Sequence, residues 1–405
     1  MKNEIIKNKA FMKLWLGSTV SNLGDSMDNI VFIMLAIKLT NSPSATGILM
    51  MIISLPNFIF SILGGTVADN YEKKKIMLYA NLGQGLVTLI ILILVMFDKM
   101  TFLALCILLF IVESLSRFNT PAYMALLPSI VEKKLFVNAR AFSLSTQSVI
   151  GMVGPSIAAI LINNGYTLPI AFDAFSYIFA AFMIGITSIK VSILKKTKVK
   201  NIFTKEFMND IIDGFKYLKL NKNLLSIFSL IFFINLFLGF FDVALPFYVK
   251  INLRLPTQYY GYLKTMAIGT FVFASFIITK STILKPGKIS VLSIFPMGIS
   301  LIVFGLSKNF FISSIFWIVA SIFRCFIVLM LNSFYGLIGD DQYRGRIMGM
   351  STMLYATIVP ISNGLSGIMV QSFTASVIFI LSGFGLLLVA IVYLFNRSLL
   401  QYKIN

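Results

Sequence analysis

The stretch GGTVADNYEKKK, residues 64–75, joins an apolar run to a cluster of lysines. Two glycines end the apolar run, Asp69 follows, and Lys73, Lys74 and Lys75 close the stretch. Such a junction is typical of the point where a membrane-spanning helix reaches water on the basic side of a membrane. The glycines let a neighbouring helix approach closely, because no Cβ atom intervenes. The stretch therefore predicts the end of one span and a short connection to the next.

The composition of the whole chain supports this interpretation. Of its 405 residues, 58% are hydrophobic and only 12% are charged, whereas soluble domains carry about 25% charged residues. Residues 86–97 and 376–395 contain no charged side chain. Apolar runs of about 18 residues or more predict transmembrane helices. We therefore expect an all-α membrane protein.

Hydropathy and turn residues predict twelve spans in two six-helix, pseudo-symmetric halves. The halves echo each other, since Asp28 precedes Gly47 by the interval that separates Asp242 from Gly261. Such parallel repeats occur in transporters. The predicted domains are residues 1–188, a basic linker 189–222, and residues 223–405. The predicted spans are 12–38, 44–68, 76–97, 101–124, 141–163, 166–188, 223–249, 258–279, 289–307, 310–336, 346–370 and 373–395.

The basic residues predict the orientation in the membrane. If both termini are cytoplasmic, most lysines and arginines fall in cytoplasmic connections, as the positive-inside rule requires. This placement explains the net charge of +19 without a nucleic-acid partner, and it suits a plasma membrane with an anionic inner leaflet. The basic residues expected on the outer side are Lys38, Lys99, Lys250, Arg254 and Lys308.

The linker between the halves contains an amphipathic pattern. Five apolar residues recur at steps of three and four, with charged residues between them, which predicts a helix. This helix either lies on the inner membrane surface or packs as a linker between the halves. The apolar residues are Phe203, Phe207, Ile211, Phe215 and Leu218.

Several classes of site are not expected. Cys106 and Cys325 lie inside predicted spans, as small buried hydrophobes do, so no disulfide framework is predicted. Histidine is absent, which excludes histidine metal sites and histidine proton relays. We expect no metal and no cofactor. The chain lacks the Gly-x-x-x-x-Gly-Lys-Ser/Thr motif of ATP-driven pumps, and no catalytic constellation predicts an enzyme.

Charged side chains at membrane depth are the strongest candidates for function, because each costs about 2.5–3.5 kcal/mol on insertion scales. Asp25 and Asp28 are three residues apart and share a helix face. Carboxylates close together in a low dielectric repel when both are ionised, so one is expected to take up a proton near neutral pH. The alternative is a set of structural ion pairs. The predicted proton-coupling residues are Asp25, Asp28, Glu113, Arg117 and Arg324.

Other polar residues within spans have less specific roles. Asp242 and Lys264 lie at similar depth and predict an ion pair that serves structure or an outer gate. Asp173 is interpreted as a polar packing residue. A mostly apolar substrate pocket is expected near the midplane. The residues predicted to line it are Asn29, Phe32, Met34, Tyr123, Asn235, Phe240, Asp242 and Tyr355.

The pattern Gly65-x-x-x-Asp69-x-x-x-Lys73-Lys74 resembles the loop 2–3 signature of the major facilitator superfamily. It departs from that signature at Asn70 and Glu72, where the family has a basic residue and a glycine. The resemblance implies a latch on the cytoplasmic side in which Asp69 meets the start of span 11. The implied latch residues are Gly65, Asp69, Lys73, Lys74, Arg140, Arg344 and Arg346.

Three further stretches, residues 8–27, 119–131 and 213–225, resemble the branch of drug and macrolide exporters, with their siderophore-exporting relatives. In span 5, Gly151, Gly154 and Pro155 resemble a signature of exporters that run as antiporters. The structural interpretation of the same residues is a kinked helix that packs closely on its neighbours. Together these imply proton-coupled efflux of a hydrophobic drug-like molecule such as a macrolide. A siderophore or metabolite exporter, an importer, and a non-transporting receptor or scaffold stay open.

Overall fold

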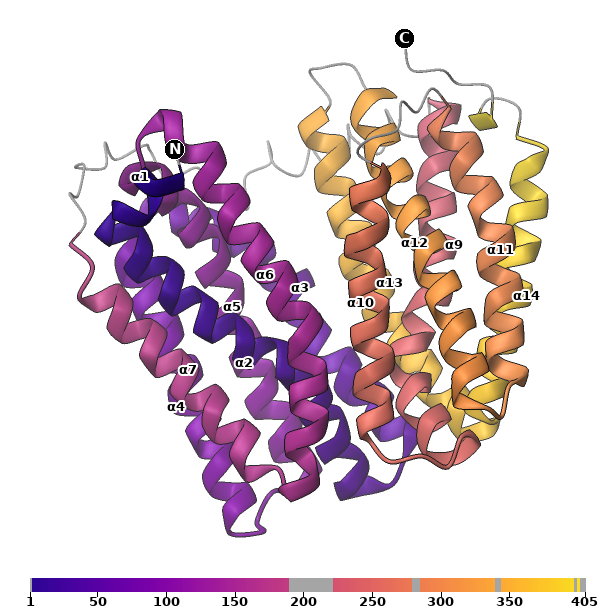
Figure 1. The fold of residues 1–405 in the computed structure, drawn as a ribbon, viewed down its shortest axis with the longest axis horizontal. Helices are drawn as coiled ribbons and strands as arrows, with labels where there is room; N and C mark the ends of the chain where they lie inside the picture. The colour runs from indigo at the N-terminus through magenta and orange to yellow at the C-terminus, as the bar shows by residue number, and fades with distance from the viewer. Residues whose placement is uncertain (1, 189–220, 279–284, 339–343, 397–398, 401–405) are drawn as a thin grey trace. The chain divides into compact units, whose positions relative to one another are not determined.

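The computed structural model describes residues 2–188, 221–278, 285–338, 344–396 and 399–400. Twelve helices in these ranges are long and apolar enough to cross a membrane, and the predicted all-α fold with twelve spans is confirmed (Figure 1). Their bounds are α2 Lys9–Thr40, α3 Pro43–Asn70, α4 Lys73–Met96, α5 Phe102–Ile130, α6 Phe136–Leu161, α7 Thr167–Gly185, α9 Lys222–Phe247, α10 Gln258–Ile278, α11 Pro286–Leu306, α12 Phe310–Ile338, α13 Arg344–Ser372 and α14 Ala375–Leu394.

Local sequence signals set several helix ends. The Asn8 side chain accepts a hydrogen bond of 3.0 Å from the Phe11 backbone N–H and begins α2. The Thr101 hydroxyl does the same for Ala104 at 3.2 Å and begins α5. Side-chain caps of this kind satisfy backbone donors that have no partner within the helix. Asn41 caps the C-terminal end of α2 and adopts the left-handed conformation with φ 48°.

The chain forms two compact units. The first contains Met1–Asn41 and Ile52–Ile202, and the second contains Ser42–Met51 and Phe203–Asn405. The first turns of α3 thus belong to the second unit, where Gly47 packs so closely on α13 that an added Cβ would lie 2.7 Å from the Gly367 Cα. The amphipathic helix expected in the linker falls within 189–220 and lies outside the described residues.

In the first unit, α7 packs along both α2 and α4, while α6 packs on α2 and α5 packs on α4. Glycine permits the closest of these approaches. An added Cβ at Gly24 on α2 would lie 2.6 Å from Ser176 Oγ on α7. An added Cβ at Gly154 on α6 would lie 2.6 Å from Ser26 Cβ on α2. The middle of α2 is therefore held between α6 and α7, as small residues allow in membrane bundles.

The second unit has an aromatic core. Tyr248, which follows α9 in a π-helical turn, stacks on Phe304 of α11 with ring centroids 4.4 Å apart. Phe379 of α14 meets Phe304 edge to face at 4.7 Å, and Trp317 of α12 lies 5.0 Å from the same ring. The Tyr248 hydroxyl lies 2.5 Å from the Phe304 carbonyl oxygen. Buried aromatic rings prefer such stacked and edge-to-face arrangements, and a buried tyrosine hydroxyl usually has a hydrogen-bond partner.

Candidate functional site

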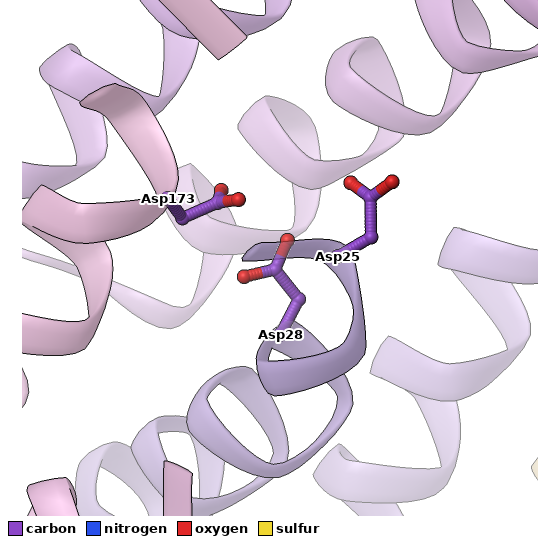
Figure 2. A group of neighbouring side chains, drawn as sticks. All are labelled: Asp25, Asp28 and Asp173. Carbon is purple, nitrogen blue, oxygen red and sulfur yellow. The ribbon is translucent and has the colours of Figure 1, made fainter. Parts of the chain in front are cut away.

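Three aspartates meet inside the first unit. Asp25 and Asp28 come from α2, and Asp173 comes from α7. One carboxylate oxygen from each lies within 4.8 Å of the others. Figure 2 shows the Asp28 and Asp173 carboxyl groups turned toward one another, with Asp25 one turn along α2. The predicted shared face of Asp25 and Asp28 is therefore present, and α7 adds a third carboxylate to it.

The close approach at Gly24 brings Asp173 to this position. An added Cβ at Gly24 would overlap Asp173 Oδ1, so the carboxyl group rests directly on the α2 backbone. Asp173 is fully buried. Ser176 Oγ donates to the Asp173 carbonyl oxygen at 2.7 Å and lies 3.5 Å from Oδ1. Asp173 Oδ2 is buried and accepts no hydrogen bond from an amide, hydroxyl or basic group, which is costly for an ionised carboxylate at membrane depth.

Asp25 differs from Asp173 in its surroundings. Its side chain is exposed rather than buried. The hydroxyl of Tyr177, one helical turn beyond Asp173, donates to Asp25 Oδ1 at 2.5 Å. A hydrogen bond from a neutral hydroxyl orients the carboxylate without neutralising it. Among the described residues, no lysine or arginine forms an ion pair with Asp25, Asp28 or Asp173.

A cavity of about 120 Å³ leads to Asp25. It runs along α2 from the level of Trp15 to Asp25, about 15 Å at the rise of an α-helix. Its lining is more polar than apolar, because the helices turn their amide and hydroxyl side chains toward it. The mostly apolar substrate pocket expected near the midplane stays a prediction. The polar lining residues are Ser18, Thr19, Ser21, Asn22, Asp25, Asn81, Gln84, Ser116, Asn119, Thr120, Tyr123, Arg140, Ser143, Gln147 and Tyr177.

Glu113 and Arg117 form a separate ion pair on α5. Arg117 Nη2 lies 2.6 Å from Glu113 Oε2, and Nη1 donates to Asn57 of α3 at 3.3 Å. Glu113 is thus neutralised by a residue one turn away. Of the two basic residues in the predicted proton-coupling set, Arg117 pairs with Glu113, while Arg324 is exposed on α12.

Asp242 of α9 and Lys264 of α10 form the ion pair that the sequence predicts. Lys264 Nζ lies 2.5 Å from Asp242 Oδ1. The same ammonium group lies 5.9 Å from the centre of the Tyr260 ring. Because both charges lie at the depth of a membrane span, removing one leaves the other without compensation.

This ion pair predicts a stability difference between single and double variants. Lys264→Met is expected to lower the free energy of unfolding by about 1.5–3 kcal/mol, the range for hydrogen bonds to charged groups. Adding Asp242→Leu is expected to restore most of that loss, because it removes the uncompensated carboxylate. Thermal unfolding in detergent measures both. A double variant that is less stable than Lys264→Met would contradict the pairing argument.

The other residues predicted to line a substrate pocket have varied surroundings. Tyr123 lines the cavity of the first unit, and its hydroxyl lies 3.3 Å from Ser143 Oγ. Asn235 donates to the carbonyl oxygen of the preceding turn at 2.9 Å. The exposed residues are Asn29 and Tyr355, and the buried ones are Phe32, Met34 and Phe240.

The predicted latch residues lie near helix ends. Asp69 is exposed, and nothing lies within 4 Å of an added Cβ at Gly65. Lys74 Nζ donates to the Gly185 carbonyl oxygen at 2.9 Å, where a cation suits the negative C-terminal end of α7. The side chains of Arg344 and Arg346 are outside the described set, and Lys73 is half-buried. The contact of Asp69 with the start of α13 stays a prediction.

Of the three span-5 residues, only two lie in close packing. Gly154 meets Ser26, and Pro155 is buried inside α6. Gly151 has no atom within 4 Å of an added Cβ. The antiporter interpretation of these residues stays a prediction.

Sequence reasoning missed the contribution of α7 and α4 to the site. Asp173 was expected to be a packing residue, and Asn81 and Gln84 were not singled out. Their signal in the sequence is weak, since a polar residue within a span has many structural uses. The one available clue is that Asp173, Ser176 and Tyr177 share a helix face by their spacing.

Comparison with known proteins is consistent with this architecture. A family model described as transmembrane secretion effector matches residues 5–402. The uncharacterized MFS-type transporter YkuC of Bacillus subtilis is 24% identical over 415 residues, covering 99% of this chain and 94% of the relative. Macrolide efflux protein A of Streptococcus pyogenes is 23% identical over 390 residues, with 94% of each chain covered.

Solved structures share the fold at low sequence identity. A bacterial homologue of the iron transporter ferroportin, in the inward-facing state, has a TM-score of 0.73 at 12% identity and covers 95% of this chain and 98% of its own. The nucleoside transporter NupG has a TM-score of 0.76 at 12% identity, with 95% and 99% covered. The family match spans nearly the whole chain, and twelve helices suit a membrane-spanning transporter. The chain belongs to the transmembrane secretion effector family of major facilitator transporters.

Proposed function

We propose that this transporter exports hydrophobic, drug-like molecules such as macrolides across the plasma membrane in exchange for protons. The observation that carries the proposal is the group of three carboxylates at the deep end of a polar cavity. Exchange of this kind needs a group that binds a proton in one state of the transporter and releases it in the other. No catalytic step is part of the proposal.

Asp25 and Asp28 are the proposed proton carriers. Asp25 lies where the cavity ends, so a chain of water molecules along the polar lining gives protons a path to it. Asp28 lies between Asp25 and the buried Asp173. Because three ionised carboxylates this close repel strongly, at least one proton is expected to reside on the group near neutral pH.

The orientation predicted from the basic residues places both termini in the cytoplasm. The cavity begins near Trp15, close to the N-terminal end of α2, and therefore on the cytoplasmic side in this orientation. Substrate and protons would compete for the acidic end of the cavity. Alternating access would then couple outward movement of substrate to inward movement of protons.

Two observations support a macrolide-like substrate. Macrolide efflux protein A resembles this chain over 94% of its length. Macrolides carry a basic amine, and the acidic end of the cavity would favour a cation there over a strongly anionic molecule. The amide and hydroxyl side chains of the lining can bind the hydroxyl groups of such a molecule.

The polar lining also favours a second candidate, a metabolite or siderophore exporter of the same fold. Five amide side chains lie around a cavity that carries only one basic residue, Arg140. They suit a neutral, hydrogen-bonding molecule as well as a macrolide. The amides are Asn22, Asn81, Gln84, Asn119 and Gln147.

The test is transport in proteoliposomes that contain the purified full-length chain. An imposed pH gradient is expected to drive accumulation of a labelled macrolide on the acidic side of the membrane beyond the level in protein-free vesicles, and a protonophore is expected to abolish it. The panel includes a macrolide, lipophilic cations, a neutral metabolite and a siderophore. Accumulation that persists with protonophore would contradict proton coupling, and accumulation of the metabolite or siderophore alone would replace the macrolide by the second candidate.

A further inference from the structure

We propose that Asp25, Asp28 and Asp173 form a binding site for a hard divalent cation of the size of Ca²⁺. Such a site goes beyond proton-coupled export, because it requires neither a drug substrate nor a gradient. The sequence predicts no metal site, since histidine is absent and no metal motif is present. The structure, however, brings three carboxylates together from two helices that are far apart in the sequence (Figure 2).

The spacing of the ligand atoms fits an ion of this size. One carboxylate oxygen from each aspartate lies within 4.8 Å of the others. Ca²⁺ binds oxygen at about 2.3–2.6 Å, so two ligands on opposite sides of the ion lie at most about 5.2 Å apart. Mg²⁺ requires near-ideal octahedral geometry and gives up its water ligands reluctantly, so a group of protein carboxylates is expected to hold it less well than Ca²⁺. Three oxygens this close to one another are near enough for one Ca²⁺ ion to be shared among them.

The charge of the site also favours binding of a cation. Asp173 is fully buried, and Asp28 is half-buried at the same level. In the described part of the chain, arginine and lysine pair with other carboxylates: Arg117 with Glu113, and Lys264 with Asp242. Burying several unpaired carboxylates is expensive unless protons or a bound cation neutralise them. A divalent ion supplies two charges at once and competes with protons for the same oxygens.

Unpaired buried oxygens on α4 are an independent observation that indicates a ligand. Asn81 Oδ1, Gln84 Oε1 and Thr88 Oγ1 have no hydrogen-bond partner. Their residues are 1–2% exposed and recur at steps of three and four on one face of α4. Buried polar atoms are rarely left unsatisfied in native structures, so these oxygens point to a bound species that interacts with them.

Two of these side chains face the cavity that ends at Asp25. Asn81 and Gln84 line it together with Asp25 and Tyr177. Gly85, next to Gln84, packs on α7 so that an added Cβ would lie 3.4 Å from Tyr177 Cβ. This face of α4 is therefore level with the acidic group. Direct or water-mediated contacts from such amide oxygens are typical of Ca²⁺ sites.

The donor set defines the class of ion. The three carboxylates, the Tyr177 hydroxyl and the two amide carbonyls are all oxygen donors. Oxygen donors select Ca²⁺, Mg²⁺ or Mn²⁺, whereas Zn²⁺ and Cu⁺ prefer imidazole or thiolate. Both cysteines, Cys106 and Cys325, lie outside the group. We therefore expect Ca²⁺ and Mn²⁺ to bind, Mg²⁺ to bind more weakly, and Zn²⁺ to gain no advantage.

The test is equilibrium binding of radioactive Ca²⁺ to the purified full-length protein in detergent, without drug or gradient. The wild-type protein is expected to show saturable binding that Mn²⁺ displaces more effectively than Mg²⁺. Asp173→Asn is expected to weaken binding by about tenfold or more. Asp98→Asn is the matched control, since Asp98 lies in the connection between α4 and α5, and it is expected to bind as the wild type does.

Asp25→Asn gives a second variant in case the buried Asp173→Asn does not fold, because Asp25 is exposed. It is also expected to weaken binding. Absence of saturable Ca²⁺ binding to folded wild-type protein at neutral and mildly alkaline pH would overturn the site. So would wild-type affinity in a folded variant of either aspartate. Since the assay contains no substrate, failure of drug transport leaves its result unaffected, and the two proposals are tested separately.

Discussion

Asp25→Asn is expected to reduce macrolide accumulation driven by a pH gradient to the level of protein-free vesicles. Asp25 is the one member of the acidic group that lines the cavity. Asparagine keeps nearly the same shape and still accepts the Tyr177 hydrogen bond, but it cannot take up or release a proton near neutral pH. Substrate binding and alternating access need no titration at this position. Transport down a substrate gradient is therefore expected to continue.

Comparing gradient-driven transport with substrate exchange in the same variant distinguishes a loss of proton coupling from a loss of folded protein. Proteoliposomes loaded with unlabelled macrolide measure exchange in the absence of a pH gradient, and the variant is expected to retain it. Asp28→Asn is expected to behave in the same way, because Asp28 shares the acidic group with Asp25. Gradient-driven accumulation at the wild-type rate in either variant would remove that aspartate from the coupling mechanism.

Gly154→Ala is expected to destabilise the first unit far more than Gly151→Ala does. An added Cβ at Gly154 would overlap Ser26 Oγ and would lie 2.6 Å from Ser26 Cβ. Ser26 Oγ also donates to the Leu23 carbonyl oxygen at 2.8 Å, which limits its freedom to move aside. Rotation of the hydroxyl leaves the Cβ overlap in place, so α6 must move away from α2. Overpacking of this kind costs about 1–3 kcal/mol.

Gly151 lies on the same helix and is the matched control. Nothing lies within 4 Å of its added Cβ. Alanine is a better helix former than glycine by about 1 kcal/mol, so Gly151→Ala is expected to be neutral or stabilising. Thermal unfolding in detergent measures both variants. Equal melting temperatures for the two would show that the approach of α6 to Ser26 is not tight.

The fold was more predictable from the sequence than the site was. Each span is a long apolar segment with turn residues at its ends, and this pattern needs no knowledge of neighbours. The pairing of Asp242 with Lys264 was also predictable, because their depths follow from the helical rise. The twelve helices and this ion pair therefore agree with the sequence.

The acidic site depends on which helices meet, and a single sequence does not contain that information. Asp25 and Asp28 were candidates because of their spacing alone. Asp173 joins them only because α7 packs on α2 at Gly24, where no side chain intervenes. Glu113 has a similar depth but pairs with Arg117. The polar character of the cavity has the same origin, since Asn81 and Gln84 of α4 line it together with Tyr177 of α7.

Release of protons on substrate binding is the most direct test of the central claim that the acidic end of the cavity exchanges protons for substrate. A pH-indicator dye reports this release when a macrolide is added to purified protein in weakly buffered detergent near neutral pH. The account predicts saturable proton release by the wild-type protein and little or none by Asp25→Asn. Saturable macrolide binding without any proton release by the wild-type protein would contradict it.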